Sequence, residues 1–233
     1  MQRASLALAA VAGLSVSCAA SAGILTWSGQ LQMVGDTETP LSFEYGELTS
    51  NDHMSLYIEQ IGHTLDGGLM ADIPGEADTY TRLNRPDEPF ELEAGTLIDS
   101  YFIHQDLTNN GPGFGLLMSF SITFDKPVLG LIVGGDWAGP SLFRTTLDDS
   151  DFLGEGVSYT KNSDERRRGS LEGSSAEFLT ISEDGFTVTG ALYTTGVHVD
   201  NVRIITEGSI IPTPGATALL GLAGIVLFRR RRA

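Results

Sequence analysis

The chain has 233 residues, of which 41% are hydrophobic, 8% aromatic and 19% charged, with 30 acidic residues against 14 basic ones and a single cysteine. This length suits one domain and is sufficient to bury a core without disulfide or metal cross-links. The composition excludes a wholly disordered chain and a polytopic membrane protein.

Residues 1–22 are typical of a secretory signal peptide. Arg3 supplies the positive start and residues 6–16 form an apolar stretch, which is too short to span a bilayer as a stable helix. We therefore expect export through the Sec translocon. The expected cleavage site consists of small residues, namely Ala20, Ala22 and Gly23.

The only cysteine, Cys18, lies inside this signal segment. A lipid-modified cysteine is an alternative, but residues 15–17 read Ser-Val-Ser and lack the usual leucine. If cleavage follows Ala22, the mature chain has no cysteine and forms no disulfide in an oxidising compartment.

The C-terminal segment, residues 210–233, has three parts in a fixed order. Pro212, Thr213 and Pro214 precede an uncharged run, residues 215–228, and a basic cluster follows it. At ~1.5 Å per residue this run gives a helix of about 21 Å, which is a marginal span for a hydrocarbon core of ~30 Å. The positive-inside rule places the tail in the cytoplasm and the domain outside. The cluster consists of Arg229, Arg230, Arg231 and Arg232.

This arrangement resembles the PEP-CTERM sorting signal of exported bacterial proteins, although Thr213 stands where that pattern has glutamate. The resemblance implies recognition by an exosortase, a membrane protease or transpeptidase that cuts near the prolines. The protein would then lie in the inner membrane transiently, before release or attachment at the cell surface. A permanent single-span membrane anchor is the alternative.

The middle of the chain shows a second, weaker resemblance over about residues 95–206. Its segments are 100–104, 122–130, 151–154 and 200–206. They are similar to the β-rich ectodomain that PEP-CTERM proteins often carry, which implies a fold and a location and no reaction.

Charge limits the partners of the exported part. Arg3 and the four terminal arginines lie in the two end segments, which leaves 9 basic and 30 acidic residues, a net charge of −21, in residues 23–209. Such a charge repels nucleic acid and anionic membranes. It favours solubility and divalent cations, and extracellular polysaccharide is a candidate partner. An ordinary solvated surface is the simpler interpretation of this charge.

Residues 23–209 consist of short β-type runs separated by turn residues, and none sustains a helical period. Residues 119–124 and 186–189 alternate apolar and polar side chains, which is typical of half-buried strands. We therefore expect an all-β ectodomain, an antiparallel β-sandwich or jelly roll, with long loops at 66–89 and 160–175. The expected strands are 24–34, 54–61, 98–104, 116–124, 128–133, 176–181, 186–193 and 197–206.

The loop at 160–175 holds the one basic cluster of the domain, Lys161 and residues 166–168. It could bind an acidic polymer, but pairing with its own acidic neighbours is the simpler interpretation.

Oxygen ligands for calcium are densest at Asp148, Asp149 and Asp151. Ca²⁺ takes 6–8 oxygen ligands from flexible loops, so the sequence predicts a structural calcium site here, with an acidic turn as the alternative. We expect no other cofactor.

Two His-x-Asp triplets, His104 with Asp106 and His198 with Asp200, fall in expected strands. Positions i and i+2 share a strand face, so each triplet could present two metal ligands, and adjacent strands would bring four together. Chance pairs that form ordinary hydrogen bonds are the alternative.

The sequence predicts no catalysis. It lacks a Gly-x-Ser-x-Gly elbow and a His-Glu-x-x-His motif. Trp137 lies in a glycine-rich context and could belong to a sugar platform, although most tryptophans pack in cores. We therefore expect a structural or adhesive surface protein, with a lectin-like or carbohydrate-active jelly roll as the alternative.

Overall fold

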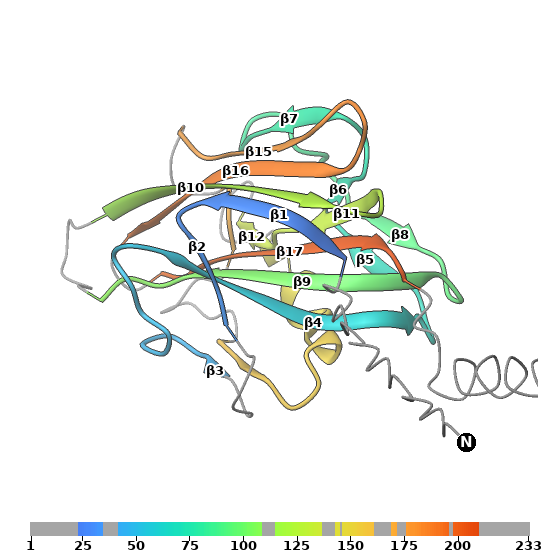
Figure 1. The fold of residues 1–233 in the computed structure, drawn as a ribbon, viewed down its shortest axis with the longest axis horizontal. Helices are drawn as coiled ribbons and strands as arrows, with labels where there is room; N and C mark the ends of the chain where they lie inside the picture. Colours follow the sequence, from blue (N-terminus) through green and yellow to red (C-terminus); the bar gives the residue numbers. More distant parts are fainter. Residues whose placement is uncertain are drawn as a thin grey trace, which may run out of the picture.

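The computed structural model describes residues 23–34, 42–108, 115–136, 143–144, 146–160, 169–171, 176–195 and 198–209. Strands dominate these residues, which confirms the all-β prediction (Figure 1). The helices among them are short, α1 (Thr146–Asp149) and the 3₁₀ turn η1 (Asp151–Leu153), and none is long and apolar enough to cross a membrane. The expected signal segment 1–22 and sorting segment 210–233 lie outside the described residues.

Seventeen strands are present in the described part of the chain. They are β1 (Ile24–Gly29), β2 (Leu31–Met33), β3 (Ser42–Phe43), β4 (Met54–Thr64), β5 (Leu69–Ala71), β6 (Ile73–Pro74), β7 (Asp78–Tyr80), β8 (Phe90–Leu92), β9 (Leu97–Gln105), β10 (Gly115–Phe124), β11 (Val128–Ile132), β12 (Gly135–Asp136), β13 (Phe143–Arg144), β14 (Ser158–Tyr159), β15 (Phe178–Ile181), β16 (Thr187–Thr195) and β17 (Asp200–Glu207).

Two large sheets form two layers (Figure 1). One has five strands in the order β1-β10-β16-β15-β7, and the other has six in the order β2-β4-β9-β17-β11-β6. The main core lies between them, because β10 and β16 turn alternate apolar residues inward, as their sequence pattern predicts. Its members include Met118, Phe120 and Ile122 from β10, with Leu56, Ile103 and Val202 from the facing sheet.

The six-stranded sheet is also covered on its other face. A second apolar cluster gathers there under β3, β14 and the α1–η1 segment, and it includes Phe43, Phe102, Leu147 and Tyr159. Strands β9 and β17 are therefore buried at nearly every position, and both of their faces carry core residues.

One expected strand, residues 24–34, is in fact two strands in different sheets. The chain leaves β1 at Gly29, which has φ +84°, and enters β2 in the six-stranded sheet. A Cβ at Gly29 would lie 2.4 Å from the Ser119 carbonyl oxygen, so only glycine fits this crossing. Strand β2 then runs parallel to β4, and β14 runs parallel to β3, so a purely antiparallel arrangement was wrong at these two pairs.

The expected loop at residues 66–89 was also partly wrong. It contains β5, β6 and β7, which pair with β8, β11 and β15 respectively. This segment thereby supplies an edge strand to each of the two large sheets. These strands have two or three residues each, too few to show a period in the sequence.

Candidate functional site

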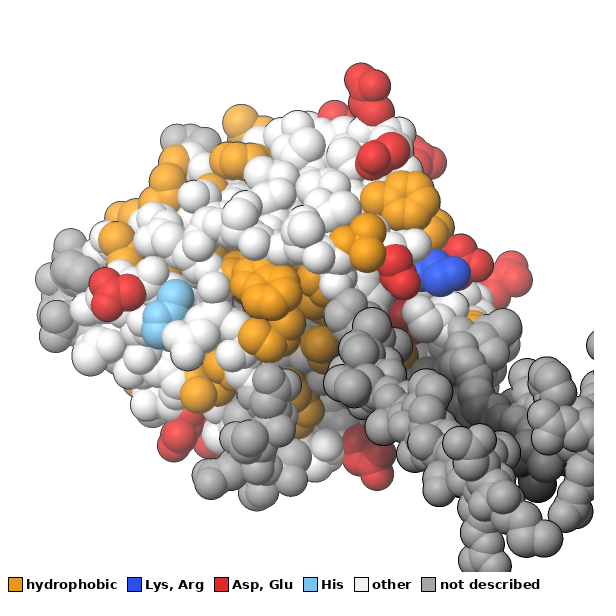
Figure 2. Space-filling model, in the orientation of Figure 1, with side chains coloured by type: hydrophobic (Ala, Val, Ile, Leu, Met, Phe, Trp, Pro, Cys, Tyr) orange, Lys and Arg blue, Asp and Glu red, His pale blue; other side chains and the backbone are white. Residues whose placement is uncertain are grey.

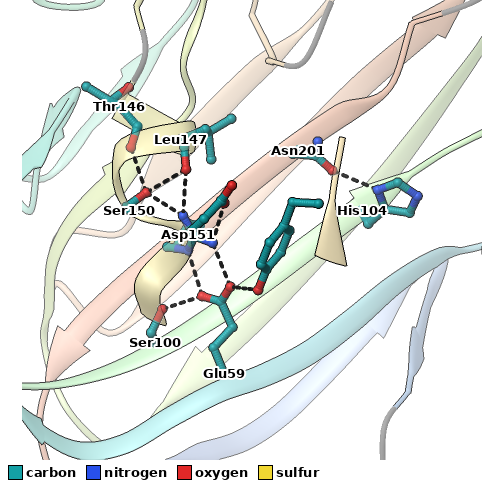
Figure 3. Close-up of polar contacts among 10 residues, drawn as sticks. Glu59, Ser100, His104, Thr146, Leu147, Ser150, Asp151 and Asn201 are labelled. Carbon is teal, nitrogen blue, oxygen red and sulfur yellow. Dashed lines mark hydrogen bonds and ion pairs between the residues drawn. The ribbon is translucent and has the colours of Figure 1, made fainter. Parts of the chain in front are cut away.

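Among the described residues, an extensively hydrogen-bonded polar group lies on the outer face of the six-stranded sheet, beneath the α1–η1 segment (Figure 3). Glu59 comes from β4, Ser100 from β9, Tyr159 from β14 and Arg203 from β17. A register shift between Ile58 and Gln60 interrupts the β4–β9 pairing at Glu59. We call these four residues the Glu59–Arg203 cluster.

The centre of the cluster is a bidentate ion pair between Arg203 and Glu59. Arg203 Nε lies 2.6 Å from Glu59 Oε2, and Arg203 Nη2 lies 2.7 Å from Oε1. Ser100 Oγ donates to Oε2 at 2.6 Å, and the Tyr159 hydroxyl donates to Oε1. Both side chains of the ion pair are fully buried, so both carboxylate oxygens are satisfied without water.

The remaining donors of Arg203 point to the α1–η1 segment. Nη1 donates to the Leu147 carbonyl oxygen at 3.2 Å and to Ser150 Oγ, and Nη2 reaches Asp151 Oδ1 at 3.4 Å. All five guanidinium N–H groups thus have acceptors within the chain. The guanidinium carbon also lies 5.1 Å from the Phe102 ring centre and 5.4 Å from that of Tyr159.

The environment fixes the charge states of two members. Burial raises the pKa of the Tyr159 hydroxyl, and the negative charge of Glu59 raises it further, so Tyr159 stays protonated and acts as a donor. Burial alone would lower the pKa of Arg203, but Glu59 more than offsets this, and the net pKa is raised. Arg203 is therefore a permanent cation at this position.

This saturation determines what the cluster can do. A catalytic acid, base or binding group needs a polar atom that is free to meet a substrate, and Arg203 has no N–H left for one. The cluster therefore joins the α1–η1 segment to the sheet, since Arg203 bonds Leu147 and Ser150, which lie 56 and 53 residues earlier in the sequence.

The predicted calcium ligands lie on this tied segment. Asp148 and Asp149 end α1, and Asp151 begins η1 with one carboxylate oxygen directed at Arg203. Within the residues that the structure describes, no three His, Cys, Asp or Glu side chains gather in a way that could hold a metal ion. Calcium at this segment stays a prediction.

The two His-x-Asp triplets do not converge, although their strands are adjacent. The register pairs His104 with Asn201 and Gln105 with Asp200. Directly paired residues share a face and successive residues alternate, so His104 and Asp200 face opposite sides of the sheet. His104 Nδ1 instead lies 2.8 Å from Asn201 Oδ1, and the four-ligand site was wrong.

The two ends of the described domain meet at Asp99, which is fully buried. Its carboxylate accepts hydrogen bonds from the Gly62 N–H at 2.6 Å and from the N–H and hydroxyl of Ser209 at 3.1 and 3.0 Å. At the other end, a Cβ on Gly23 would lie 3.3 Å from Asp99 Oδ2 and 1.9 Å from the Tyr101 hydroxyl. A cavity of about 610 Å³ opens beside this junction, lined in part by Lys126, Glu207 and Ser209.

Several residues singled out in the sequence lie outside the described part of the chain. Gly23 alone of the expected cleavage residues is described, and it is buried. The residues that lie outside the described part are Ala20, Ala22, Trp137, Lys161, Arg166, Arg167, Arg168, Pro212, Thr213, Pro214, Arg229, Arg230, Arg231 and Arg232.

Comparison with known proteins adds no relative: no family model, curated protein or solved structure matches this chain. The Glu59–Arg203 cluster was not predicted from the sequence. Its one available signal was a charge inside an apolar strand, since Arg203 stands between Val202 and Ile204. A charged residue at such a position needs a buried partner, but the sequence does not say which one.

Proposed function

We propose that this chain is an exported protein of the bacterial cell surface or extracellular matrix, sorted by an exosortase-type system, whose jelly-roll-like ectodomain is structural or adhesive. The observation that carries this proposal is the three-part C-terminal segment: the proline motif, the uncharged run and the arginine cluster. A signal segment at the other end of the chain supports the same route.

The structure adds support at the junction between the domain and this segment. Ser209 is fixed to Asp99 by two hydrogen bonds, and Gly208 N–H donates to the Leu97 carbonyl at 2.9 Å. The folded domain is thus anchored up to the residue before the expected sorting segment. A cut near Pro212 would leave this anchoring, and the core, intact.

The Glu59–Arg203 cluster supports a non-enzymatic role for its own part of the domain. Its donors and both of its carboxylate oxygens are used to hold the fold together. A domain that works as a structural component needs such rigidity more than it needs reactive groups.

The intact mass of the protein recovered from the surface or medium tests this function. A mass that corresponds to Gly23 at the start and a residue near Pro212–Pro214 at the end is expected. A mass that retains the four terminal arginines would contradict exosortase sorting and would establish the permanent single-span anchor.

A variant pair sharpens this test. Pro212→Ala with Pro214→Ala should leave the full-length form in the inner membrane, because the cutting enzyme would no longer read its motif. Pro89→Ala, a change at a proline of the folded domain, is the matched control and should be processed like wild type. Normal processing of the double variant would refute recognition of the prolines.

A further inference from the structure

The outer face of the five-stranded sheet carries rows of hydroxyl side chains. In the register, Ser28, Ser121, Thr189, Thr180 and Thr79 lie side by side, one on each of β1, β10, β16, β15 and β7. These positions alternate with the inward core residues, so their side chains lie on the outer face. We call this surface the hydroxyl face.

A second row runs beside the first. It joins Thr26, Thr123 and Thr187 on β1, β10 and β16. With about 4.8 Å between strands and about 7 Å between alternate residues of one strand, the rows form a two-dimensional array of hydroxyl groups. Such an array presents hydroxyls at regular intervals in both directions.

Hydrogen bonds between neighbouring hydroxyl groups fix the orientations of these side chains. Ser121 and Thr189 lie 3.1 Å apart, Thr123 and Thr187 lie 3.0 Å apart, and Thr79 and Thr180 lie 2.9 Å apart, measured between hydroxyl oxygens. A hydroxyl has one proton and two lone pairs, so each pair still has one proton and further lone pairs to offer. The face therefore presents prearranged donors and acceptors, which lowers the entropy lost on binding.

Apolar side chains border the array at one end. Leu117 pairs with Tyr193, and Phe178 lies on the next strand, diagonal to Tyr193. Leu117 is 42% exposed, and both aromatic residues are partly exposed. Aromatic rings beside hydroxyl groups suit a ligand that alternates polar and apolar surface, as a sugar ring does.

Charge identifies the class of ligand. No acidic or basic side chain occupies an outward position of these rows, in a region of the sequence that carries −21 overall. Figure 2 shows a mostly white surface over β10, β16 and β15, with acidic side chains at its margin. A second copy of the chain would bring its own negative charge, whereas an uncharged polymer meets no repulsion.

From these observations we infer that the hydroxyl face binds a neutral polysaccharide, with the sugar hydroxyls on the Ser/Thr rows and sugar rings against Tyr193 and Phe178. This deepens and rests on the proposed surface or matrix function, because it names the partner of the ectodomain.

The test measures retention of the purified protein on microcrystalline cellulose, on curdlan and on the neutral polysaccharide of the exporting cells, with alginate beads as the anionic comparison. Wild type should be retained by at least one neutral polymer and not by alginate. Retention should not change between 50 and 500 mM salt, since no ion pair is involved.

Two variants test the face itself. Ser121→Glu with Thr189→Glu places charge in the central row and should weaken retention by about tenfold or more. Thr64→Glu changes an exposed strand hydroxyl on the other sheet and should bind like wild type. Phe178→Ala with Tyr193→Ala gives a second measurement on the face, with the same loss expected. Thermal melting checks that all three variants are folded.

Three results would overturn the inference. They are no retention of wild type on any neutral polymer, unchanged retention of the central-row variant, and a concentration-dependent dimer that the same variant abolishes. If intact mass shows an uncut tail, the full-length protein in detergent is assayed identically. Failure of the sorting route and failure of the polysaccharide surface are thereby separate outcomes.

Discussion

Removal of Arg203 should be among the most damaging single changes in the described domain. In Arg203→Met the five guanidinium hydrogen bonds are lost, and Glu59 stays buried with only Ser100 and Tyr159 as donors. Breaking a buried ion pair by deleting one partner costs about 3–5 kcal/mol. At about 2–4 °C per kcal/mol for a domain of this size, the melting temperature should fall by roughly 6–20 °C.

The assay is thermal and urea unfolding of the purified mature protein. Hydrogen exchange should also report a local effect, because Leu147, Ser150 and Asp151 lose their contacts with Arg203. In Arg203→Met, exchange of the amides of residues 146–160 should therefore speed up relative to wild type more than exchange of the amides of the five-stranded sheet, which does not contain the cluster.

Two further variants make the reasoning refutable. Arg82→Met, at an exposed arginine, is the matched control and should change stability by less than about 0.5 kcal/mol. Glu59→Gln with Arg203→Met removes both charges, and the amide oxygen accepts from one of the two hydroxyls of Ser100 and Tyr159 while the amide NH2 donates to the other. This double variant should therefore regain much of the loss. If the stability of Arg203→Met lies within about 1 kcal/mol of wild type, the stabilising role of the Glu59–Arg203 cluster is refuted. A double variant that is no more stable than Arg203→Met would refute it as well.

Three other predictions concern the acidic residues and the tail. Burial raises the pKa of Asp106 above its ordinary 3.8, although the hydrogen bond from the Gly46 N–H opposes this rise. Ionising the Asp106 carboxylate is therefore harder in the folded state than in the unfolded state, so the stability of the fold decreases as pH rises from 3.8 through the folded pKa. Asp106→Asn, which keeps an acceptor for Gly46, should therefore melt higher than wild type at pH 7, and melting curves should show this gain disappear below pH 3.8. Calcium should raise the melting temperature of the mature protein, measured against chelator, and Asp149→Ala with Asp151→Ala should abolish the shift. Neutral residues in place of Arg229–Arg232 should cause mislocalisation or loss of processing, seen by cell fractionation and intact mass.

Each of these has a contrary result. A gain from Asp106→Asn that persists below pH 3.8 would mean that titration of Asp106 is not its cause. Equal melting in calcium and in chelator would end the calcium prediction. Unchanged surface display after loss of the arginines would remove the sorting argument.

The fold could be predicted from the sequence wherever a strand has one apolar and one polar face. The alternation in Ser119–Phe124 placed β10 correctly, because one side of that strand packs in the core and the other is solvated. Strands β9 and β17 were expected as short β-type runs, but their burial on both faces was not foreseen. Nothing in such a run says which face meets which layer.

The site was less accessible to sequence reasoning because it depends on register. Whether His104 faces Asp200 is decided by a one-residue offset between β9 and β17, which a triplet motif does not contain. Likewise Glu59 and Arg203 are 144 residues apart, and they meet only because β4 and β17 both pair with β9. Local patterns predict elements, whereas pairing between distant strands creates the site.

The position of the domain's exit supports a role for the hydroxyl face in a tethered protein. The chain leaves at Ser209, after β17 of the six-stranded sheet, and is fixed there by Asp99. The hydroxyl face is the outer surface of the other large sheet. A domain attached through its C-terminal end would therefore keep this face free, before and after processing. Polysaccharide binding should accordingly be equal for the cut form and for the uncut Pro212→Ala/Pro214→Ala form in detergent. A loss in the uncut form would show that the tail covers the face.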